Sequence, residues 1–369
     1  MKIKTTLAGK TNFIELLEGR KFFAAVLPAF ADQIGLTSSI NPTPTFVDEF
    51  DGTALDRTKW QTREANRHRL EPNSPDFAVT SPDAVKVVNG ELNLISHNDP
   101  VTGQYKSGWI QTALNGTSSG GLVPGSSANF TQAYGYWEAK LKMSSISGMW
   151  NAFWVHSSNL PEVADDPAKV NRPEVYGTEM DVVEQSAVRI DAASGDTVHT
   201  TTHANGYGQY HISSSSHTNV ATLPNTGSSA GDYHIYGLLW TPTSVSVYMD
   251  GTLAYRETNF ALVSKVAQYA ILSNEIGAPG SKTLGNGRLS WGAVPAGGYG
   301  AVETSTAKLT ADYVRVWTMK GTTTPTPVPT VPPRPTRPSL PRIRLIDIHF
   351  TPITPLADPI RGRDPVSFI

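Results

Sequence analysis

The fold is constrained most by a series of short segments in which apolar and polar residues alternate, joined by dipeptides that form tight turns. Asn89-Gly90 and Asp250-Gly251 each separate two such segments. Both dipeptides tolerate the positive φ that a two-residue hairpin turn requires. No segment in the body of the chain, residues 44–319, shows a long helical period. The sequence therefore predicts one all-β domain built as an antiparallel β-sandwich.

Composition and charge narrow the classes of function. The chain has 369 residues, which suits one large β domain. Its net charge of −2 argues against a nucleic-acid partner, because such proteins carry clustered Lys and Arg. The absence of cysteine excludes disulfide scaffolds, thiolate metal sites and cysteine nucleophiles. No apolar run approaches the length of a membrane span, so no membrane partner is expected.

The N-terminal segment, residues 1–43, is interpreted as a leader followed by a flexible stretch. It begins with several lysines, continues into an apolar run over residues 22–30, and contains the small-residue cleavage pattern Ala29-Phe30-Ala31. These features are typical of a secretory signal peptide, with an amphipathic helix as the alternative. We therefore expect a secreted, extracellular protein.

The C-terminal part is predicted to be a linker and a tail. Residues 320–341 are rich in Thr and Pro, and such a composition favours a semi-rigid polyproline II spacer. Residues 342–369 are too short to fold alone, and we expect them to be disordered. The Thr-Pro spacer and the missing cysteines point to a bacterial source.

Three acidic side chains mark the segment that is most informative about function. Glu179 and Asp181 are two residues apart and share one face of a strand, because side chains alternate between faces. Strict alternation would send Glu184 to the opposite face. A β-bulge after Asp181 would insert one residue and return Glu184 to the face of the other two acids. We predict this bulge, with the residues Met180 and Val182 packed beneath.

Three carboxyl groups held close together suit a glycosidase. Like charges in a partly dry site raise the pKa of at least one member. A retaining glycosidase needs an ionised nucleophile and a protonated acid about 5–5.5 Å away. We assign Glu179 as nucleophile and Glu184 as general acid and base, with Asp181 hydrogen-bonded to the nucleophile. This chemistry needs no cofactor. The alternative is a solvated strand face or a set of calcium ligands.

Aromatic residues favour the catalytic interpretation, because indole rings stack on the flat faces of sugars. Trp150 lies upstream of the acids, and Trp109 and Trp291 lie in Gly-rich or loop-like contexts. We predict that these three tryptophans bind substrate, with Trp154 packed in the core.

The acidic motif resembles that of glycoside hydrolase family 16. Residues 179–184 match its pattern E-[apolar]-D-x-x-E, in the six-residue form of the laminarinase, agarase and carrageenase branches. Stretches that are similar to the family follow in the same order along the chain: 46–52, 105–110, 134–139, 148–154, 233–242 and 312–317. The resemblance implies a concanavalin-like jelly roll with an open cleft on its concave face, and it implies the same roles for the three acids.

The resemblance also implies residues that the pattern alone would not single out. His203 and Asn205, in the stretch 202–206, correspond to the cleft near the acid/base. Glu49, the carbonyl of Gly90 and Asp312 correspond to a structural calcium site, and calcium favours such oxygen ligands.

We therefore expect a monomeric, secreted endo-β-glycanase whose partner is a polysaccharide. The leading substrate is β-1,3- or mixed β-1,3-1,4-glucan, followed by an agar- or carrageenan-type galactan. A sulfated galactan would require cationic side chains, and Arg63, Arg67, Arg69 and Arg172 are candidates. Two alternatives stay open: a non-catalytic carbohydrate-binding module, and a transglycosylase.

Overall fold

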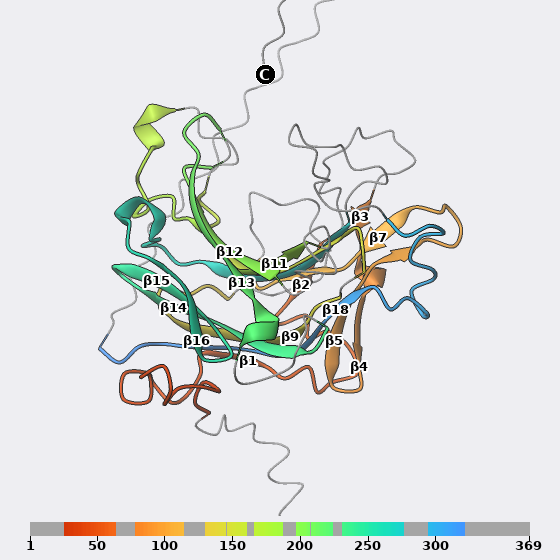
Figure 1. Cartoon of the computed structure of the whole chain (residues 1–369), viewed down its shortest axis with the longest axis horizontal. Coiled ribbons are helices and arrows are strands. Elements are labelled where there is room, and N and C mark those ends of the chain that lie inside the picture. The colour runs from red at the N-terminus through yellow and green to blue at the C-terminus, as the bar shows by residue number, and fades with distance from the viewer. Residues whose placement is uncertain are drawn as a thin grey trace, which may run out of the picture. The chain divides into compact units, whose positions relative to one another are not determined.

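Two antiparallel sheets lie over one another in the part of the chain that the computed structural model describes (Figure 1). The described residues are 26–63, 78–113, 130–144, 146–160, 166–186, 197–206, 208–223, 231–276 and 294–321. The chain divides into two units, Met1–Val328 and Pro329–Ile369, and all described residues belong to the first. No helix among these residues is long and apolar enough to cross a membrane. The predicted tail and nearly all of the predicted linker lie outside them.

The larger sheet has eight strands, called here the eight-stranded sheet. Its strands lie in the order β16 (Thr252–Glu257), β15 (Ser244–Met249), β14 (Tyr233–Thr241), β9 (Gly135–Lys142), β18 (Lys308–Trp317), β5 (Glu91–Ile95) and β4 (Val85–Val88), with β1 (Phe46–Asp48) paired to β18.

The second, seven-stranded sheet carries the three acids. Its strands lie in the order β13 (Ile212–Asn219), β12 (Thr197–Ala204), β11 (Glu179–Ser186), β10 (Met149–His156), β17 (Tyr269–Ile276), β8 (Trp109–Gln111) and β2 (Gln61–Thr62). A small third sheet joins β3 (Val79–Thr80), β7 (Tyr105–Ser107) and β6 (His97–Asn98). Short 3₁₀ helices are η1 (Pro82–Ala84), η2 (Pro167–Lys169), η4 (Val220–Thr222) and η5 (Phe260–Leu262).

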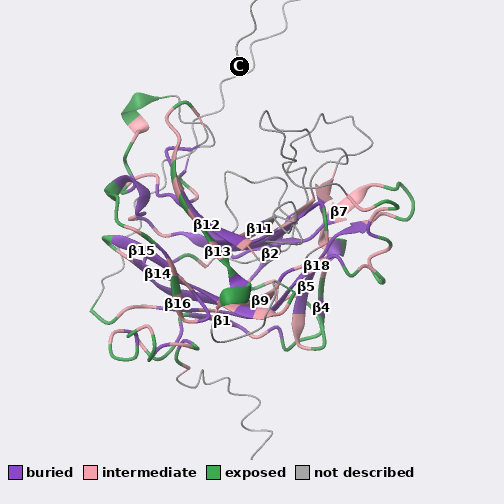
Figure 2. Cartoon of the chain, viewed as in Figure 1, coloured by how far each residue is buried: buried purple, intermediate pink, exposed green. Residues whose placement is uncertain are grey.

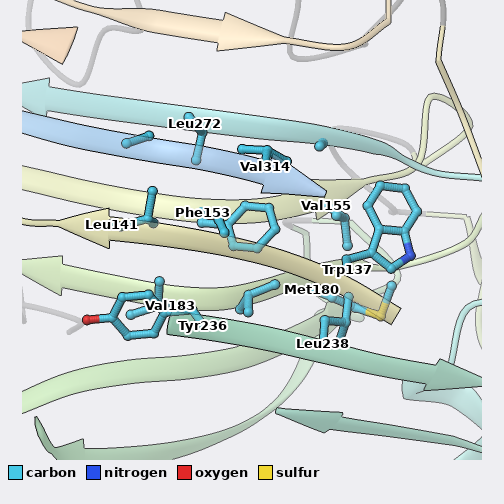
Figure 3. Close-up of a cluster of buried hydrophobic side chains, with 14 of the residues drawn as sticks. Trp137, Leu141, Phe153, Val155, Met180, Val183, Tyr236, Leu238, Leu272 and Val314 are labelled. Atoms are coloured by element: carbon cyan, nitrogen blue, oxygen red, sulfur yellow. The ribbon is translucent and has the colours of Figure 1, made fainter. Parts of the chain in front are cut away.

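The core lies between the two large sheets, where the described residues are most buried (Figure 2). Alternate residues of each strand point into it. Figure 3 shows side chains of both sheets meeting there: Trp137, Leu141, Phe153, Val155, Met180, Val183, Tyr236, Leu238, Leu272 and Val314. Full burial of one such aliphatic or aromatic side chain contributes about 1.5–3 kcal/mol, so this alternation fixes the register of the sheets.

Both predicted hairpin turns are present. Asn89 and Gly90 have φ of 55° and 80° between β4 and β5, and Asp250 and Gly251 have φ of 48° and 76° between β15 and β16. A hydrogen bond also fixes the second turn, because Asp250 Oδ1 accepts it from the backbone N–H of Ile235 at 2.8 Å. The tight turns therefore place neighbouring strands as the sequence indicated.

The N-terminal residues 26–43 pack against the eight-stranded sheet. Three buried side chains of this segment, Ala31, Leu36 and Ile40, form an apolar cluster with Tyr136 and Trp317 of the sheet. Trp317 Nε1 donates a hydrogen bond to the carbonyl of Val26 at 2.6 Å. The sequence analysis expected a flexible stretch before residue 44. Residues 26–43 are instead held in place by this apolar cluster and its hydrogen bonds. Residues 1–25, the predicted leader, lie outside the described part.

A buried carboxyl group lies where this segment meets the sheet. Glu138 on β9 is fully buried, its Oε2 accepts the N–H of Ala29 at 3.1 Å, and its Oε1 accepts the hydroxyl of Tyr313 at 3.0 Å. Burial raises the pKa of Glu138 to about 7, against the opposing effect of these hydrogen bonds. The folded protein therefore binds a proton at Glu138 that the unfolded chain releases at lower pH.

We predict that Glu138→Gln removes a loss of stability that the wild type shows between about pH 4.5 and pH 7. A raised carboxyl pKa gives stability that is present below the unfolded value and lost as pH rises through the folded one. Gln resembles the protonated carboxyl, because each has one acceptor end and one donor end: Gln Oε1 can accept the N–H of Ala29, and Nε2 can donate to the hydroxyl oxygen of Tyr313. Thermal unfolding at pH 4 and pH 8 checks this, with the exposed Glu303→Gln as control. Parallel Tm curves for wild type and Glu138→Gln would contradict the prediction.

Candidate active site

A β-bulge in β11 places the three acids on one face. On the β12 side, Asp181 lies opposite Thr201 and Glu184 opposite His199, with a shift of register between them. On the β10 side, the register shifts at the same point, so that Val182 is an additional residue. Val182 and the following valine are both fully buried in the core between the sheets. The bulge predicted from the spacing of the acids is therefore present.

The entry into β11 depends on one glycine. Gly177 has φ of 70°, and a Cβ there would lie 2.6 Å from the Cβ of Ser157. Its N–H donates to the carbonyl of Pro173 at 3.1 Å, closing the turn before the strand. A side chain at position 177 would clash with Ser157 and strain the backbone, so the turn requires glycine. The strand that follows this turn begins at Glu179.

Each acid has a nitrogen partner on a neighbouring strand. His156 Nε2, at the end of β10, lies 3.3 Å from Glu179 Oε2. His203 Nε2 on β12 lies 3.2 Å from Asp181 Oδ2. The third acid, Glu184, accepts a hydrogen bond from Trp150 Nε1 at 2.8 Å. The face therefore supplies separate donors for separate carboxyl groups.

Burial and neighbouring charge give the titratable groups of this face different pKa values. Burial, reinforced by the charge of Glu179, raises the pKa of Asp181. Burial, reinforced by the charge of Asp181, raises the pKa of Glu184 further, although the hydrogen bond from Trp150 opposes the shift. Burial disfavours the charge of His203, but the Asp181 carboxylate outweighs this and raises the pKa of His203 to about 9. The site thus holds a protonated acid beside a cation, which suits general acid catalysis.

Two histidines that the sequence analysis did not single out support this arrangement. His156 shares its face with Trp150, since both occupy even positions of β10, and that spacing was a usable signal. Tyr269 Oη lies 3.4 Å from His156 Nδ1. His211 Nε2 lies 2.8 Å from His203 Nδ1, so His203 has a partner at each ring nitrogen. The contact of His211 depends on a turn and could not be read from strand spacing.

The structure corrects two of the predicted substrate contacts. Trp109 is fully buried, with its ring edge-on to Trp154 at 5.3 Å between centroids and Arg63 Cζ 4.7 Å from its ring centroid. It therefore offers no open face to a sugar. Asn205 is also buried, and its amide is used internally: Oδ1 accepts the N–H of Asn171 at 2.8 Å, and Nδ2 donates to the carbonyl of Tyr210 at 3.0 Å.

Other predicted contacts have different outcomes. Trp150 is half-buried and lies beside Glu184, as described above. Its binding to a sugar stays a prediction. Trp291, Arg67 and Arg69 lie outside the described residues. Arg172 is exposed, and its Nε lies 3.3 Å from Glu174 Oε1.

Two of the three residues expected to bind calcium contact cationic side chains. Glu49 forms a two-pronged pair with Arg315, at 2.7 and 2.8 Å. Asp312 Oδ2 accepts from Lys140 Nζ at 2.7 Å. Gly90 lies in the hairpin turn after β4. Calcium binding at these three positions stays a prediction, and the ion would need further oxygen ligands, because Ca²⁺ takes six to eight. No step below relies on calcium.

Within the described ranges, one group of His, Asp and Glu side chains is close enough to share a metal ion. It consists of Glu179, Asp181 and His203, with one atom of each within 4.8 Å of the others. The close approach is accounted for by the ion pair between His203 and Asp181 and by the bulge. We therefore interpret these residues through proton chemistry.

We predict that Trp150→Phe raises the pKa of Glu184 further, because it removes the indole N–H that favours the ionised carboxyl. A ¹³C-carboxyl NMR titration of Glu184 measures the shift. Trp154→Phe is the matched control: Trp154 lies on the same face of β10, but its Nε1 donates to Ser273 Oγ at 3.1 Å. An unchanged or lowered pKa in Trp150→Phe, or an equal rise in both variants, would contradict the assignment.

The sequence matches a family profile and curated proteins. The profile, described as the GH16 domain of β-porphyranases A–D, matches residues 41–319. The chain is 26% identical over 232 residues to glucan endo-1,3-β-glucosidase A1 of Niallia circulans, covering 58% of this chain and 29% of that protein. It is 28% identical over 215 residues to β-porphyranase E of Zobellia galactanivorans, covering 56% and 65%. These matches span less than two thirds of either relative.

A solved structure supports the fold. The endo-β-1,3-glucanase from Pyrococcus furiosus superposes with a TM-score of 0.50 at 21% identity, covering 75% of this chain and 94% of that chain. At this identity the likeness shows the fold alone, and it confirms the expected jelly roll. Because the profile covers most of the chain and every element of both sheets, the chain belongs to glycoside hydrolase family 16.

Proposed function

We propose that this chain is an endo-acting glycosidase that hydrolyses β-linked polysaccharide with retention of configuration. The observation that carries the proposal is the bulge at Val182, which brings Glu179, Asp181 and Glu184 to one face. Membership of the family supports the hydrolase class. The raised pKa of Glu184 supports its role as the acid.

In the first step, Glu179 attacks the anomeric carbon of the sugar. A bond forms between a carboxylate oxygen and that carbon, while the bond from the carbon to the glycosidic oxygen breaks. Glu184 transfers its proton to the departing oxygen, so the leaving chain is released as an alcohol. The products are a covalent glycosyl-enzyme, an ionised Glu184 and a free chain end.

In the second step, Glu184 acts as a base. It takes a proton from water, whose oxygen attacks the anomeric carbon and breaks the ester to Glu179. Two displacements at one carbon restore the original β configuration. Because the covalent bond neutralises Glu179 between the steps, the charge that raises the pKa of Glu184 is partly removed, and Glu184 can then act as a base.

The neighbouring groups hold the charges during this cycle. His156 lies beside the nucleophile and restrains the carboxylate that must attack. His203 stays cationic near Asp181, and this cation limits the repulsion among three acids. His203 also acts directly on Glu184, because its charge lowers the pKa of that acid against the larger effects of burial and of Asp181.

The comparisons support two substrate classes as proposals. The profile of β-porphyranases A–D, which covers residues 41–319, favours porphyran or a related galactan as the first substrate to test. The relative named as a glucan endo-1,3-β-glucosidase favours β-1,3-glucan as the second. Since such polymers do not enter cells, we also propose that the protein acts outside the cell.

We predict that Glu179→Gln abolishes turnover and leaves oligosaccharide binding largely intact, because Gln keeps the shape of the carboxyl but is a poor nucleophile. Release of reducing ends from porphyran, agarose, carrageenan, laminarin and lichenan, together with calorimetric titration of oligosaccharides, measures both. Glu174→Gln, an exposed carboxyl on the preceding turn, is the control and should keep wild-type turnover. If wild type and Glu179→Gln both bind and neither cleaves any glycan, the chain is a carbohydrate-binding module.

We predict that Glu184→Ala slows cleavage of polysaccharide by about 10²–10⁴-fold, the usual contribution of a general acid. Azide should restore turnover of an aryl glycoside with a good leaving group, since azide needs no base and the leaving group needs no acid. NMR of the product should show a β-glycosyl azide. An α-glycosyl azide would contradict double displacement, and longer oligosaccharides in place of hydrolysis products would indicate transglycosylation.

A further inference from the structure

We infer that Thr200 is a positioning residue for the acid/base Glu184, because its hydroxyl holds the bulge that turns Glu184 away from the core. This inference rests on the proposed function and adds a residue to it. The contact is direct: Thr200 Oγ1 donates a hydrogen bond to the carbonyl of Val182 at 2.9 Å.

The position of Thr200 is opposite the irregularity itself. On β12 it lies between His199, which faces Glu184, and Thr201, which faces Asp181. Two residues of β11, Val182 and Val183, therefore face the single residue Thr200. One residue cannot pair with both through the backbone ladder, so a bulge needs a donor or acceptor from elsewhere.

Burial makes this donor necessary. Thr200 is 2% exposed, and both valines of the bulge are fully buried. A buried carbonyl without a partner costs about 1–3 kcal/mol. The Thr200 side chain alternates with those of His199 and Thr201, so it lies on the core side, where the carbonyl of Val182 is within reach. Its hydroxyl and this carbonyl satisfy one another, and its methyl group remains available for packing.

The competing arrangement explains why this contact bears on chemistry. If β11 ran without the extra residue, a shift by one position would send Glu184 toward the core and Val183 to the acidic face. The wild type avoids this slip because both valines pack in the core and the Val182 carbonyl has a donor. Without the donor, the bulge relaxes, and the carboxyl of Glu184 moves relative to Glu179.

The test compares Thr200→Val with Thr200→Ser. Val keeps the shape of the side chain and removes the donor, whereas Ser keeps the donor. We expect Thr200→Val to lower kcat/KM on the polysaccharide by on the order of 100-fold, the effect of misplacing a catalytic group by about 1 Å. An aryl glycoside with a good leaving group should keep most of its kcat/KM, because the step that this constant reports then needs no acid. Thr200→Ser should restore polysaccharide cleavage.

The matched control is Thr112→Val, a fully buried threonine directly after β8, whose hydroxyl donates to the carbonyl of Phe130 at 2.9 Å. It should change stability without changing the dependence on the leaving group. Equal losses on both substrates in Thr200→Val, or no loss at all, would overturn the inference.

A readout independent of turnover separates the inference from the proposed function. The ¹³C-carboxyl signal of Glu184 should titrate at a different pH in Thr200→Val and at the wild-type pH in Thr200→Ser. If the wild type cleaves no glycan, the proposed function fails, and this titration still decides whether Thr200 sets the surroundings of Glu184. An unchanged titration in Thr200→Val overturns the inference in either case.

Discussion

The additional residue in β11 is the constraint on which both the packing and the chemistry of this site depend. In a regular strand, only every second side chain points into the core. By carrying one residue more than its neighbours, β11 places two consecutive valines, Val182 and Val183, in the core. The same irregularity turns Glu184 to the face that carries Glu179 and Asp181. Hydrophobic burial beneath the sheet thus holds the geometry of the acids above it.

Holding three acids together has an electrostatic cost that the neighbouring strands offset. Burial, together with the charge of the neighbouring acids, raises the pKa of both Asp181 and Glu184. The partners come from different strands, so each acid meets a different environment: a histidine beside Glu179, a cationic histidine beside Asp181, and an indole N–H on Glu184. Because the donors are not shared, the acids can differ in protonation, which is what a nucleophile and an acid on one strand require.

The sequence predicted the features that depend on local spacing, and it missed those that depend on side-chain packing. The hairpin turns and the bulge follow from positive-φ dipeptides and from the interval between Asp181 and Glu184. The full burial of Trp109 does not, because it depends on Trp154 and Arg63, which approach from other strands. Asn205 was placed by resemblance, and its amide instead holds a turn through contacts to residues 171 and 210.

The aromatic side chains of the acidic face show that this face is itself partly a core. Trp109 and Trp154 pack in a second apolar cluster on the seven-stranded sheet, and half-buried Trp150 lies at its margin. A ring inside such a cluster is rigid but has no free face, whereas a ring at the margin can both pack and contact a ligand. Since Trp150 also donates to Glu184, a sugar stacked on it would lie next to the acid. Of these three tryptophans, Trp150 is therefore the one that can both pack in the cluster and contact a ligand, and its stacking on a sugar stays a prediction.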